Sequence, residues 1–248
     1  MDESLLHAFR RLEAEHWWFR ARGEILVGLV EQHLAPGSRV LDIGCGTGFF
    51  LEALKDRFEI AGLDPSAQAV SFCRARGLAT VDEGGTDDLS RLPQEAFDGI
   101  ALLDVIEHLD DDVQCLRSSL RLLKPGGYAF ITVPAYEWLW THHDDLNQHR
   151  RRYTVPRLRA SIERAGLESV LTSYFNTRLF PIAAPARLVM RLLRMKSGAG
   201  LGLPPGPVNR AFYRLFAGEA RQLSRHDFVG YRFGLSALAV ARRPAGSG

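Results

Sequence analysis

The chain of 248 residues is 46% hydrophobic and 24% charged, and its formal net charge is +2. This length suits one α/β domain with an elaboration, and the balanced charge gives no overall signal for a nucleic-acid partner. The N-terminus is acidic and polar where a signal peptide needs a basic start, and no stretch reaches membrane-spanning length. Cys45, Cys73 and Cys115 lack metal-ligand spacing, which fits a reducing compartment. We expect a cytoplasmic protein, at most peripheral to the inner face of the membrane.

The predicted elements begin with capping helices over residues 1–36. From Arg39 onward, short apolar or β-branched runs alternate with helical patterns, which is typical of a parallel sheet covered on both faces. The core is predicted over 37–176 and 234–244, with strands at about 39–43, 58–63, 79–82, 97–103, 127–133, 167–175 and 234–242. Residues 177–233 interrupt this alternation. A structureless connection of that length is unusual in a compact domain, so we predict a helical lid or substrate insertion there.

A glycine-rich turn follows the first predicted strand in the stretch "VLDIGCGTGFF". Such a turn lets the backbone approach a ligand closely and aims helix N–H groups at it. The dinucleotide fingerprint needs a small residue where this chain has Phe49, and Asp42 adds negative charge where a pyrophosphate would lie. A cationic nucleoside ligand, S-adenosylmethionine, is therefore favoured. The glycines concerned are Gly44, Gly46 and Gly48.

Asp64 ends the second predicted strand in "IAGLDPS". A carboxylate at this place can accept hydrogen bonds from both hydroxyls of a ribose, which supports an adenosine ligand. The alternative is that the glycines form a simple turn and that Asp64 caps the helix beginning at Pro65 and Ser66.

With these motifs the chain resembles the class I S-adenosylmethionine-dependent methyltransferases of the small-molecule type, through "DIGCGTG", "GLDPS", "FDGIALLDVIEHLDD" and "LKPGGYAFITVP" between residues 40 and 134. The resemblance implies an α/β fold with a doubly wound, mostly parallel, seven-stranded Rossmann-like sheet and an antiparallel last strand. It implies S-adenosylmethionine as methyl donor and S-adenosylhomocysteine as product. The implied cofactor contacts are Asp42, Gly44, Cys45, Gly46, Gly48, Asp64, Pro65, Leu103, Asp104 and His108.

One position departs from the pattern of these methyltransferases. The acid that commonly contacts adenine is replaced by Gly85 in "GGTDDLS". We therefore expect adenine to be recognised near Thr86 or by Asp87.

The loop "HHDDLNQHRRRYT" follows the fifth predicted strand, at the edge where open α/β sheets bind ligands. A hydroxyl acceptor needs a base, and histidine is best matched to neutral pH. We predict His149 as that base, with Asp144, Arg151 and Tyr153 orienting the acceptor and His143 as an alternate. The alternative is a solvated basic loop.

The N-terminal "HWWFRAR" and this loop together resemble a subset of the same methyltransferases, which implies that both elements close the active site. Trp18 is a candidate aromatic flap over the sulfonium, since a cation is attracted to a ring face. Arg22 would then reach the methionine carboxylate. Core packing of a capping helix is the competing interpretation for the tryptophans.

The segment "DVIEH" resembles the E-x-x-E-H metal site proposed for ubiquinone-type O-methyltransferases, with Asp104 in place of the first glutamate. Asp104, Glu107 and His108 would share one face of a helix. Many relatives carry E-H here without needing a metal, so we assign no metal ligand and give His108 a structural or cofactor-side role.

Basic charge is concentrated in residues 177–233, where ten basic residues stand against Glu219 and Asp227. Arg187, Arg191 and Arg194 are spaced along a predicted amphipathic helix, which would suit an anionic lipid surface or a lipid-like acceptor near residues 178–195. An ordinary lid helix with one face on the core is the alternative.

The predicted function is methyl transfer from S-adenosylmethionine to a small-molecule acceptor, at an oxygen of a metabolite, glycan or lipid-linked intermediate. N- or C-methylation remains open, as does a membrane-surface protein that retains the cofactor site. A dehydrogenase is disfavoured by Phe49 and Asp42. No nucleic-acid partner is expected, because the sequence contains no appended RNA-binding module.

Overall fold

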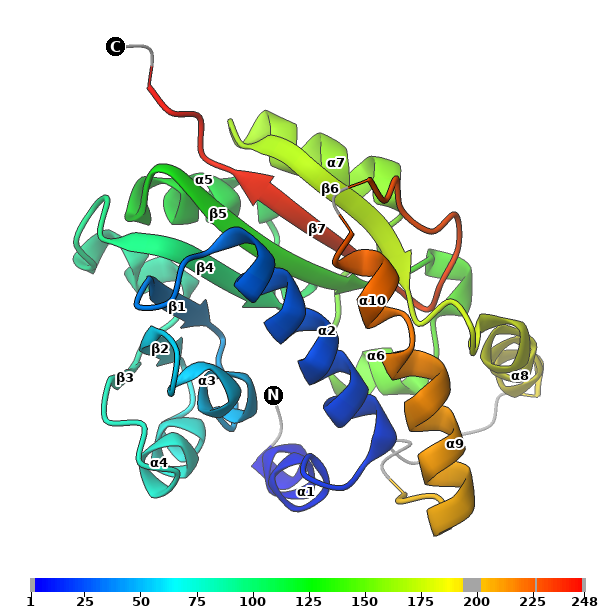
Figure 1. Ribbon diagram of the computed structural model, residues 1–248. Helices are drawn as coiled ribbons and strands as arrows, with labels where there is room; N and C mark the ends of the chain where they lie inside the picture. Colours follow the sequence, from blue (N-terminus) through cyan, green and yellow to red (C-terminus); the bar gives the residue numbers. More distant parts are fainter. Residues whose placement is uncertain (1–2, 194–201, 226, 247–248) are drawn as a thin grey trace.

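The computed structural model of the protein describes residues 3–193, 202–225 and 227–246 (Figure 1). They form a seven-stranded sheet in the order β3-β2-β1-β4-β5-β7-β6, in which β7 runs antiparallel to both of its neighbours. The strands are β1 Arg39–Ile43, β2 Glu59–Asp64, β3 Val81–Glu83, β4 Phe97–Leu103, β5 Leu123–Pro134, β6 Glu168–Phe175 and β7 Ser236–Arg242. The predicted fold class is confirmed.

The strand bounds agree with the sequence pattern to within two residues, except at the start of β5. This strand begins at Leu123, ahead of Pro125 and Gly126, because Leu123 already pairs with Phe97 of β4. The "KPGG" sequence lies within the strand, where the pairing of β4 with β5 shifts register between Phe97 and Gly99.

Helices cover both faces of the sheet (Figure 1). The helices α5 (Asp112–Leu122) and α7 (Val155–Arg164) pack on one face, and α2 (Trp17–His33), α3 (Phe49–Leu54), α9 (Gly206–Ala217) and α10 (Ala220–Leu223) on the other. Side chains of β5 alternate between the two cores, with Phe130 packing toward α2 and its neighbour Ile131 toward α5 and α7. Burial of both faces thus fixes the pairing register of the strands. This register brings the carboxyl ends of the parallel strands to one edge of the sheet.

The segment 177–233 was predicted as a helical lid or substrate insertion, and the helices in its described second half lie in the layer over the sheet. The side chain of Phe216 in α9 is fully buried, with ring centroids 6.0 Å from Trp17 and 5.9 Å from Phe175. The buried Glu219 accepts hydrogen bonds from the backbone N–H groups of Thr177, at 2.8 Å, and Arg178, at 2.9 Å. Through these contacts α9 and α10 lie beside α2 in the helical layer on the same face of the sheet.

The first half of the segment contains α8 (Phe180–Leu192). The predicted contribution of Arg194 to this helix lies outside the described residues. Among the helices that the structure describes, none combines the length and the apolar character needed to cross a membrane.

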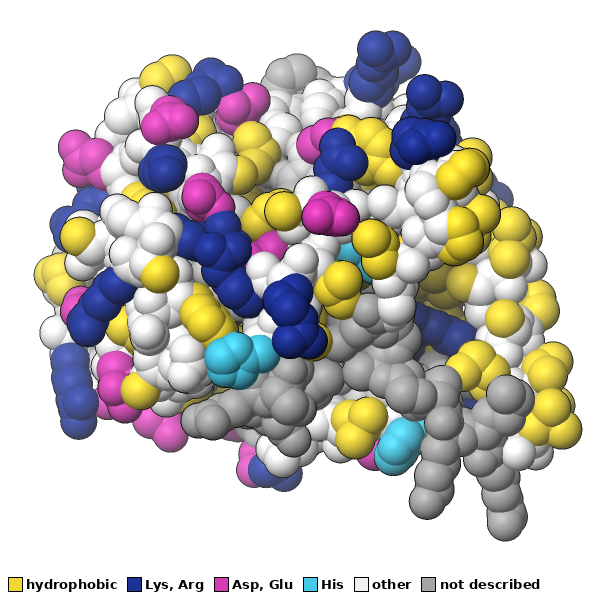
Figure 2. Space-filling model, turned by 90° about the horizontal axis from the view of Figure 1, so that it is seen from below, with side chains coloured by type: hydrophobic (Ala, Val, Ile, Leu, Met, Phe, Trp, Pro, Cys, Tyr) yellow, Lys and Arg dark blue, Asp and Glu magenta, His cyan; other side chains and the backbone are white. Residues whose placement is uncertain are grey.

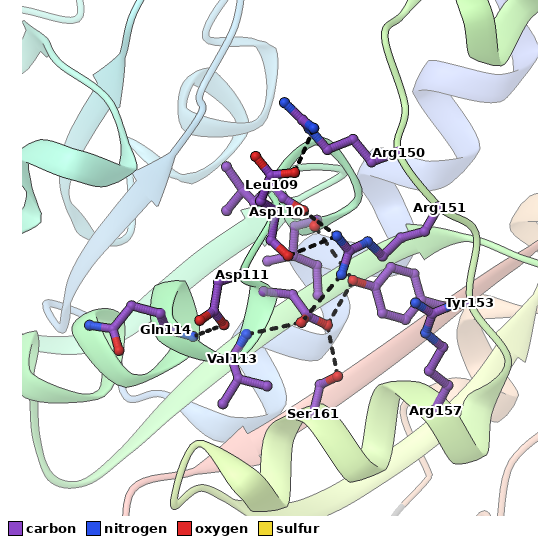
Figure 3. A network of polar contacts seen from close by, with 12 residues as sticks. Leu109, Asp110, Asp111, Val113, Gln114, Arg150, Arg151, Tyr153, Arg157 and Ser161 are labelled. Carbon is purple, nitrogen blue, oxygen red and sulfur yellow. Dashed lines mark hydrogen bonds and ion pairs between the residues drawn. The ribbon is translucent and has the colours of Figure 1, made fainter.

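The loop after β5 is anchored to the neighbouring helices through the Asp112 carboxylate (Figure 3). The hydroxyl groups of Tyr153 and Ser161 donate to its Oδ2 at 2.9 and 2.8 Å, and the Val113 N–H donates to Oδ1 at 3.1 Å. Arg151 adds an ion pair at 3.6 Å. Because these donors lower the pKa of Asp112 against the opposing effect of burial, the carboxylate stays charged and holds the loop in place.

Candidate active site

The glycine-rich turn between β1 and α3 has a left-handed backbone at three positions. Gly44, Gly46 and Gly48 have φ angles of 75°, 54° and 77°. A Cβ atom on Gly44 would lie 2.8 Å from Val105, and one on Gly48 would lie 2.7 Å from Leu78, so packing demands glycine at both places. Gly46 is different, because no described heavy atom lies within 4 Å of the position of its Cβ. Its half-buried backbone faces open space that a ligand can approach closely.

Two buried carboxylates border this turn. Asp42, at the end of β1, is 2% exposed, and its Oδ1 atom has no hydrogen-bond partner among the described residues. Asp64, at the end of β2, accepts hydrogen bonds from the N–H groups of Gly46 at 2.7 Å and Ser66 at 2.9 Å. Burial and the negative charge of Asp64 raise the pKa of Asp42 to about 8, and burial also raises the pKa of Asp64. A positively charged ligand would stabilise both ionised carboxylates, whereas a diphosphate would be repelled.

These features fit S-adenosylmethionine. The turn and Asp42 would hold the cationic methionine portion, and Asp64 would hold the ribose. Helix α4 (Ala67–Ala75) has its own N-cap in Ser66, whose Oγ accepts from the Ala69 N–H at 3.3 Å, so capping of α4 does not account for Asp64 by itself. The site lies between β1 and β4, where the strand order reverses and ligands bind in sheets of this kind.

A buried polar network supports the turn from the N-terminal side. Glu13, which follows α1 (Glu3–Leu12), accepts hydrogen bonds from the Thr47 hydroxyl and from Arg76, and Arg76 Nε donates to the Thr47 carbonyl at 2.8 Å. Sequence reasoning missed these three residues. Their separations of 34 and 63 positions leave no local pattern that could have revealed the pairing.

Arg22 and Asp104 form the opposite border of the site. Arg22 lies 2.9 Å from an Asp104 oxygen and donates to the Thr132 hydroxyl at 2.6 Å, and that hydroxyl donates to Asp104 at 3.0 Å. The Trp18 ring lies 4.8 Å from the Arg22 guanidinium. Asp104 has a φ of 59°, a strained backbone of the kind that clusters at functional sites. The structure therefore places Trp18 and Arg22 at the carboxyl edge of the sheet. There Arg22 contacts both the Trp18 ring and the Asp104 carboxylate.

The remaining predicted cofactor residues are arranged around the same strand ends. Cys45 is buried with its sulfur 4.0 Å from that of Cys73, Pro65 is exposed, and Leu103 is half-buried against the α2 side. Thr86 and Asp87 begin a short 3-10 helix after β3. There Asp88, and not the exposed Asp87, accepts a hydrogen bond from the Gly85 N–H at 2.9 Å.

The loop after β5 presents His149 together with a fully buried ion pair. His149 Nδ1 lies 2.8 Å from Asp144, and Arg152 donates to both oxygens of the same carboxylate at 2.7 and 2.9 Å. These donors hold the pKa of Asp144 far below its usual value despite burial. Because Nδ1 faces Asp144, Nε2 is the nitrogen left for chemistry. The His108 ring lies 4.9 Å away, at the end of the short 3-10 helix Ile106–His108.

Two residues predicted to take part in catalysis have other positions. Tyr153 is fully buried in the core between the sheet and α7, and its hydroxyl is committed to Asp112, so we correct its role from orienting an acceptor to anchoring the loop. His143, in α6 (His142–Leu146), faces Asn147 at 3.1 Å and does not share the Asp144 contact of His149. Arg152, which sequence analysis did not single out, is the residue that completes the Asp144 pair.

Replacing Gly46 by alanine tests whether its open face receives the cofactor. Gly37 is a matched control, since it has a φ of 82° and also has no described atom near its Cβ position. Both Gly46→Ala and Gly37→Ala should lower the free energy of unfolding by about 1 kcal/mol through backbone strain. Only Gly46→Ala should weaken S-adenosylhomocysteine binding in calorimetry, by about tenfold or more. Equal affinity in both variants would place the ligand elsewhere.

The raised pKa of Asp42 predicts a pH-dependent stability. Between about pH 4, where the unfolded chain releases this proton, and pH 8, the folded-state pKa, the folded protein keeps a proton that the unfolded chain loses. Its free energy of unfolding should therefore fall as pH rises, by at most about 1.4 kcal/mol per pH unit from this group. Asp42→Asn should remove that part of the slope in urea unfolding at pH 5 to 8. The exposed Asp87→Asn should keep the wild-type slope, and a retained slope in Asp42→Asn would refute the assignment.

Curated proteins with similar sequences include a probable S-adenosylmethionine-dependent methyltransferase from Mycolicibacterium smegmatis, 31% identical over 161 residues that make up 63% of this chain and 62% of that protein. A ubiquinone biosynthesis O-methyltransferase from Hahella chejuensis is 30% identical over 148 residues, or 54% of this chain and 62% of that protein. The matches therefore span a little over three fifths of the length of these relatives.

Among solved structures, the [4+2]-cyclase SpnF is similar with a TM-score of 0.58 and 26% identity, covering 92% of this chain and 84% of that one. The fold alone thus does not fix the reaction. The model of the family described as "Methyltransferase domain" matches residues 12–172, which include the glycine-rich turn, both acidic strand ends and the loop with His149. The chain belongs to this methyltransferase domain family, in the class I group that uses S-adenosylmethionine.

Proposed function

We propose that the protein transfers a methyl group from S-adenosylmethionine to a hydroxyl oxygen of a small-molecule acceptor. The observation that carries this proposal is the pair of buried carboxylates, Asp42 and Asp64, beside the open backbone of Gly46. Choice of oxygen as the acceptor atom is supported by His149 and its ion pair, and by the ubiquinone O-methyltransferases among the relatives. A neutral amine is nucleophilic enough to attack without first losing a proton, whereas a hydroxyl is not, so an amine acceptor would have less need of a base held in this way.

S-adenosylmethionine supplies an electrophilic methyl group on a positively charged sulfur. The residues of this chain position the acceptor oxygen in line with that methyl group and exclude water. Asp144 fixes the His149 tautomer with Nδ1 protonated, so that Nε2 can take the acceptor proton, and Arg152 keeps Asp144 ionised. His149 is thus the proposed catalytic base, while Asp144 and Arg152 are positioning residues.

Substitution of His149 tests this assignment. His149→Ala should lower turnover by about 100-fold to 10,000-fold, because a positioned base is lost, and should leave S-adenosylhomocysteine affinity unchanged. Transfer of labelled methyl from S-adenosylmethionine to a panel of phenols, catechols and sugars would be measured. His142→Ala is the control, since His142 is partly exposed and lies 3.7 Å from Asp145 instead of Asp144. Equal losses in both variants, or none, would argue against a base at His149.

The acceptor is proposed to be lipid-linked or to be met at a lipid surface. Helix α8 leaves apolar side chains in solvent, with Leu192 80%, Leu193 65% and Ile182 63% exposed. Hydrophobic side chains gather along the α8 side of the face drawn in Figure 2. Since the segment 177–233 also carries ten basic residues against two acidic ones, an anionic membrane surface complements it in charge and in polarity.

Vesicle flotation tests this contact. The full chain should float with phosphatidylglycerol vesicles and much less with neutral phosphatidylcholine vesicles, because the segment is basic. Leu192→Glu should reduce flotation, whereas Val170→Glu, at a residue 48% exposed on β6, should not. If the wild type does not float with either lipid, a water-soluble acceptor replaces the lipid-linked one and the methyl-transfer proposal is unaffected.

A further inference from the structure

A second polar cluster lies beside the proposed methyl-transfer site. Glu107 and His108 come from the 3-10 helix after β4, and His149 comes from the loop after β5. One oxygen or nitrogen atom from each of the three side chains lies within 4.8 Å of the other two. Residues so far apart in the chain meet here because β4 and β5 are neighbours and end at the same edge of the sheet.

The Glu107 carboxylate is the feature that needs an explanation. Its side chain is fully buried, and within the described part of the chain neither of its oxygens has a hydrogen-bond partner. Burying a carboxyl group without a partner is strongly unfavourable, and native structures retain few such groups. The two cations near Glu107 that act on its charge, Arg22 and Arg152, are already paired with Asp104 and Asp144. The oxygens of Glu107 therefore have the two imidazoles as neighbours and lack a donor.

The His149 imidazole is held in the way that metal-binding histidines usually are. Its Nδ1 atom lies 2.8 Å from the Asp144 carboxylate, and the His108 ring lies beside the backbone of Gln148. One nitrogen of each ring lies within 4.8 Å of a Glu107 oxygen. A hydrogen bond from one ring nitrogen to a carboxylate or a backbone oxygen fixes the tautomer and orients the other nitrogen toward a metal.

The loop that carries His149 is fixed to the 3-10 helix by its backbone. The Arg150 N–H donates to the Glu107 carbonyl at 2.9 Å, and Arg150 Nε donates to the His108 carbonyl at 2.9 Å. Gln148 adopts a left-handed backbone with a φ of 57°, which turns the chain just before His149. The three side chains are thus held together by contacts that do not depend on a ligand.

We propose that Glu107, His108 and His149 bind one divalent first-row transition-metal ion. Two imidazoles and one carboxylate form a donor set that suits Zn²⁺, Fe²⁺ or Co²⁺, whereas Mg²⁺ and Ca²⁺ favour oxygen ligands. This set differs from the E-x-x-E-H pattern. Asp104, which would be the first acid of that pattern, is paired with Arg22 and Thr132, and His149 takes its place.

The role of this ion in the reaction rests on the proposed methyl transfer to a hydroxyl oxygen. When the ion is bound, Nε2 of His149 becomes a ligand. The ion would act as a Lewis acid that lowers the pKa of a bound acceptor hydroxyl, whose proton would pass to bulk solvent before the site closes for methyl transfer. In the metal-free protein, the same Nε2 atom takes the proton directly.

Metal binding is tested without reference to activity. The chelator-treated full chain, free of affinity tags, is titrated with Zn²⁺ by calorimetry, and with Co²⁺ while the visible absorption is followed. One equivalent should bind. Glu107→Gln and His149→Ala should each weaken Zn²⁺ binding beyond the about 10-fold to 100-fold expected from losing only a hydrogen-bond partner of a metal-binding histidine. Mg²⁺ should not displace the ion.

Two controls separate this site from other sources of binding. His142→Ala should bind Zn²⁺ as the wild type does, and so should Asp104→Asn, in which only the E-x-x-E-H pattern would lose a ligand. Should Glu107→Gln fail to fold, His108→Gln and the Co²⁺ spectrum of the wild type decide the matter. Failure to bind one equivalent, or binding unchanged in Glu107→Gln and His149→Ala, overturns the proposal and means that Glu107 is buried as a neutral acid. S-adenosylhomocysteine titration of the same samples reports separately on the methyl-donor site.

Discussion

The unfavourable burial of negative charge at the carboxyl edge of the sheet is the constraint on which this site depends. Asp42 lies at the end of β1 with an unpartnered oxygen, and Asp64 lies close enough to raise its pKa further. Within the described ranges neither carboxylate is paired with a cation at short range, although Arg22 lowers the pKa of Asp42 from a distance. A fold that keeps such groups is arranged for a ligand with the opposite charge, and this explains why a cationic donor fits where a dinucleotide does not.

A second principle is that each reactive side chain is held by groups buried beneath it. The loop carrying His149 is anchored by Tyr153 on Asp112 and by Arg152 on Asp144, and both carboxylates have lowered pKa values because several donors converge on them. Arg22 is held in the same manner by Asp104 and Thr132. Buried hydrogen bonds and ion pairs therefore fix the side chains that line the proposed site, and no movement of a long loop is needed to position them.

The sequence was sufficient to predict the fold and to place Asp42 and Asp64 at the carboxyl edge of the sheet, and insufficient to predict the contacts of the residues proposed to face the acceptor. Strand periodicity and the glycine-rich turn are local signals, so the sheet and the positions of Asp42 and Asp64 could be predicted. Pairs such as Glu13 with Arg76 or Glu107 with His149 join distant segments, and no spacing encodes them. Tyr153 illustrates the limit: an aromatic residue in a polar loop has the same sequence signature whether it faces an acceptor or the core. Only the three-dimensional contacts distinguish these cases.

The place of β7 in the sheet has a consequence for synthesis of the chain on the ribosome. This strand, residues 236–242, inserts between β5 and β6 and pairs with both along its own length. Until those residues emerge from the ribosome, β5 and β6 each present an open hydrogen-bonding edge. The apolar side of α2 also stays uncovered until Phe216 has been synthesised and packs against it. The nascent protein therefore passes through a long interval with exposed edges, in which chaperones that shield unpaired strands would have most effect on its yield.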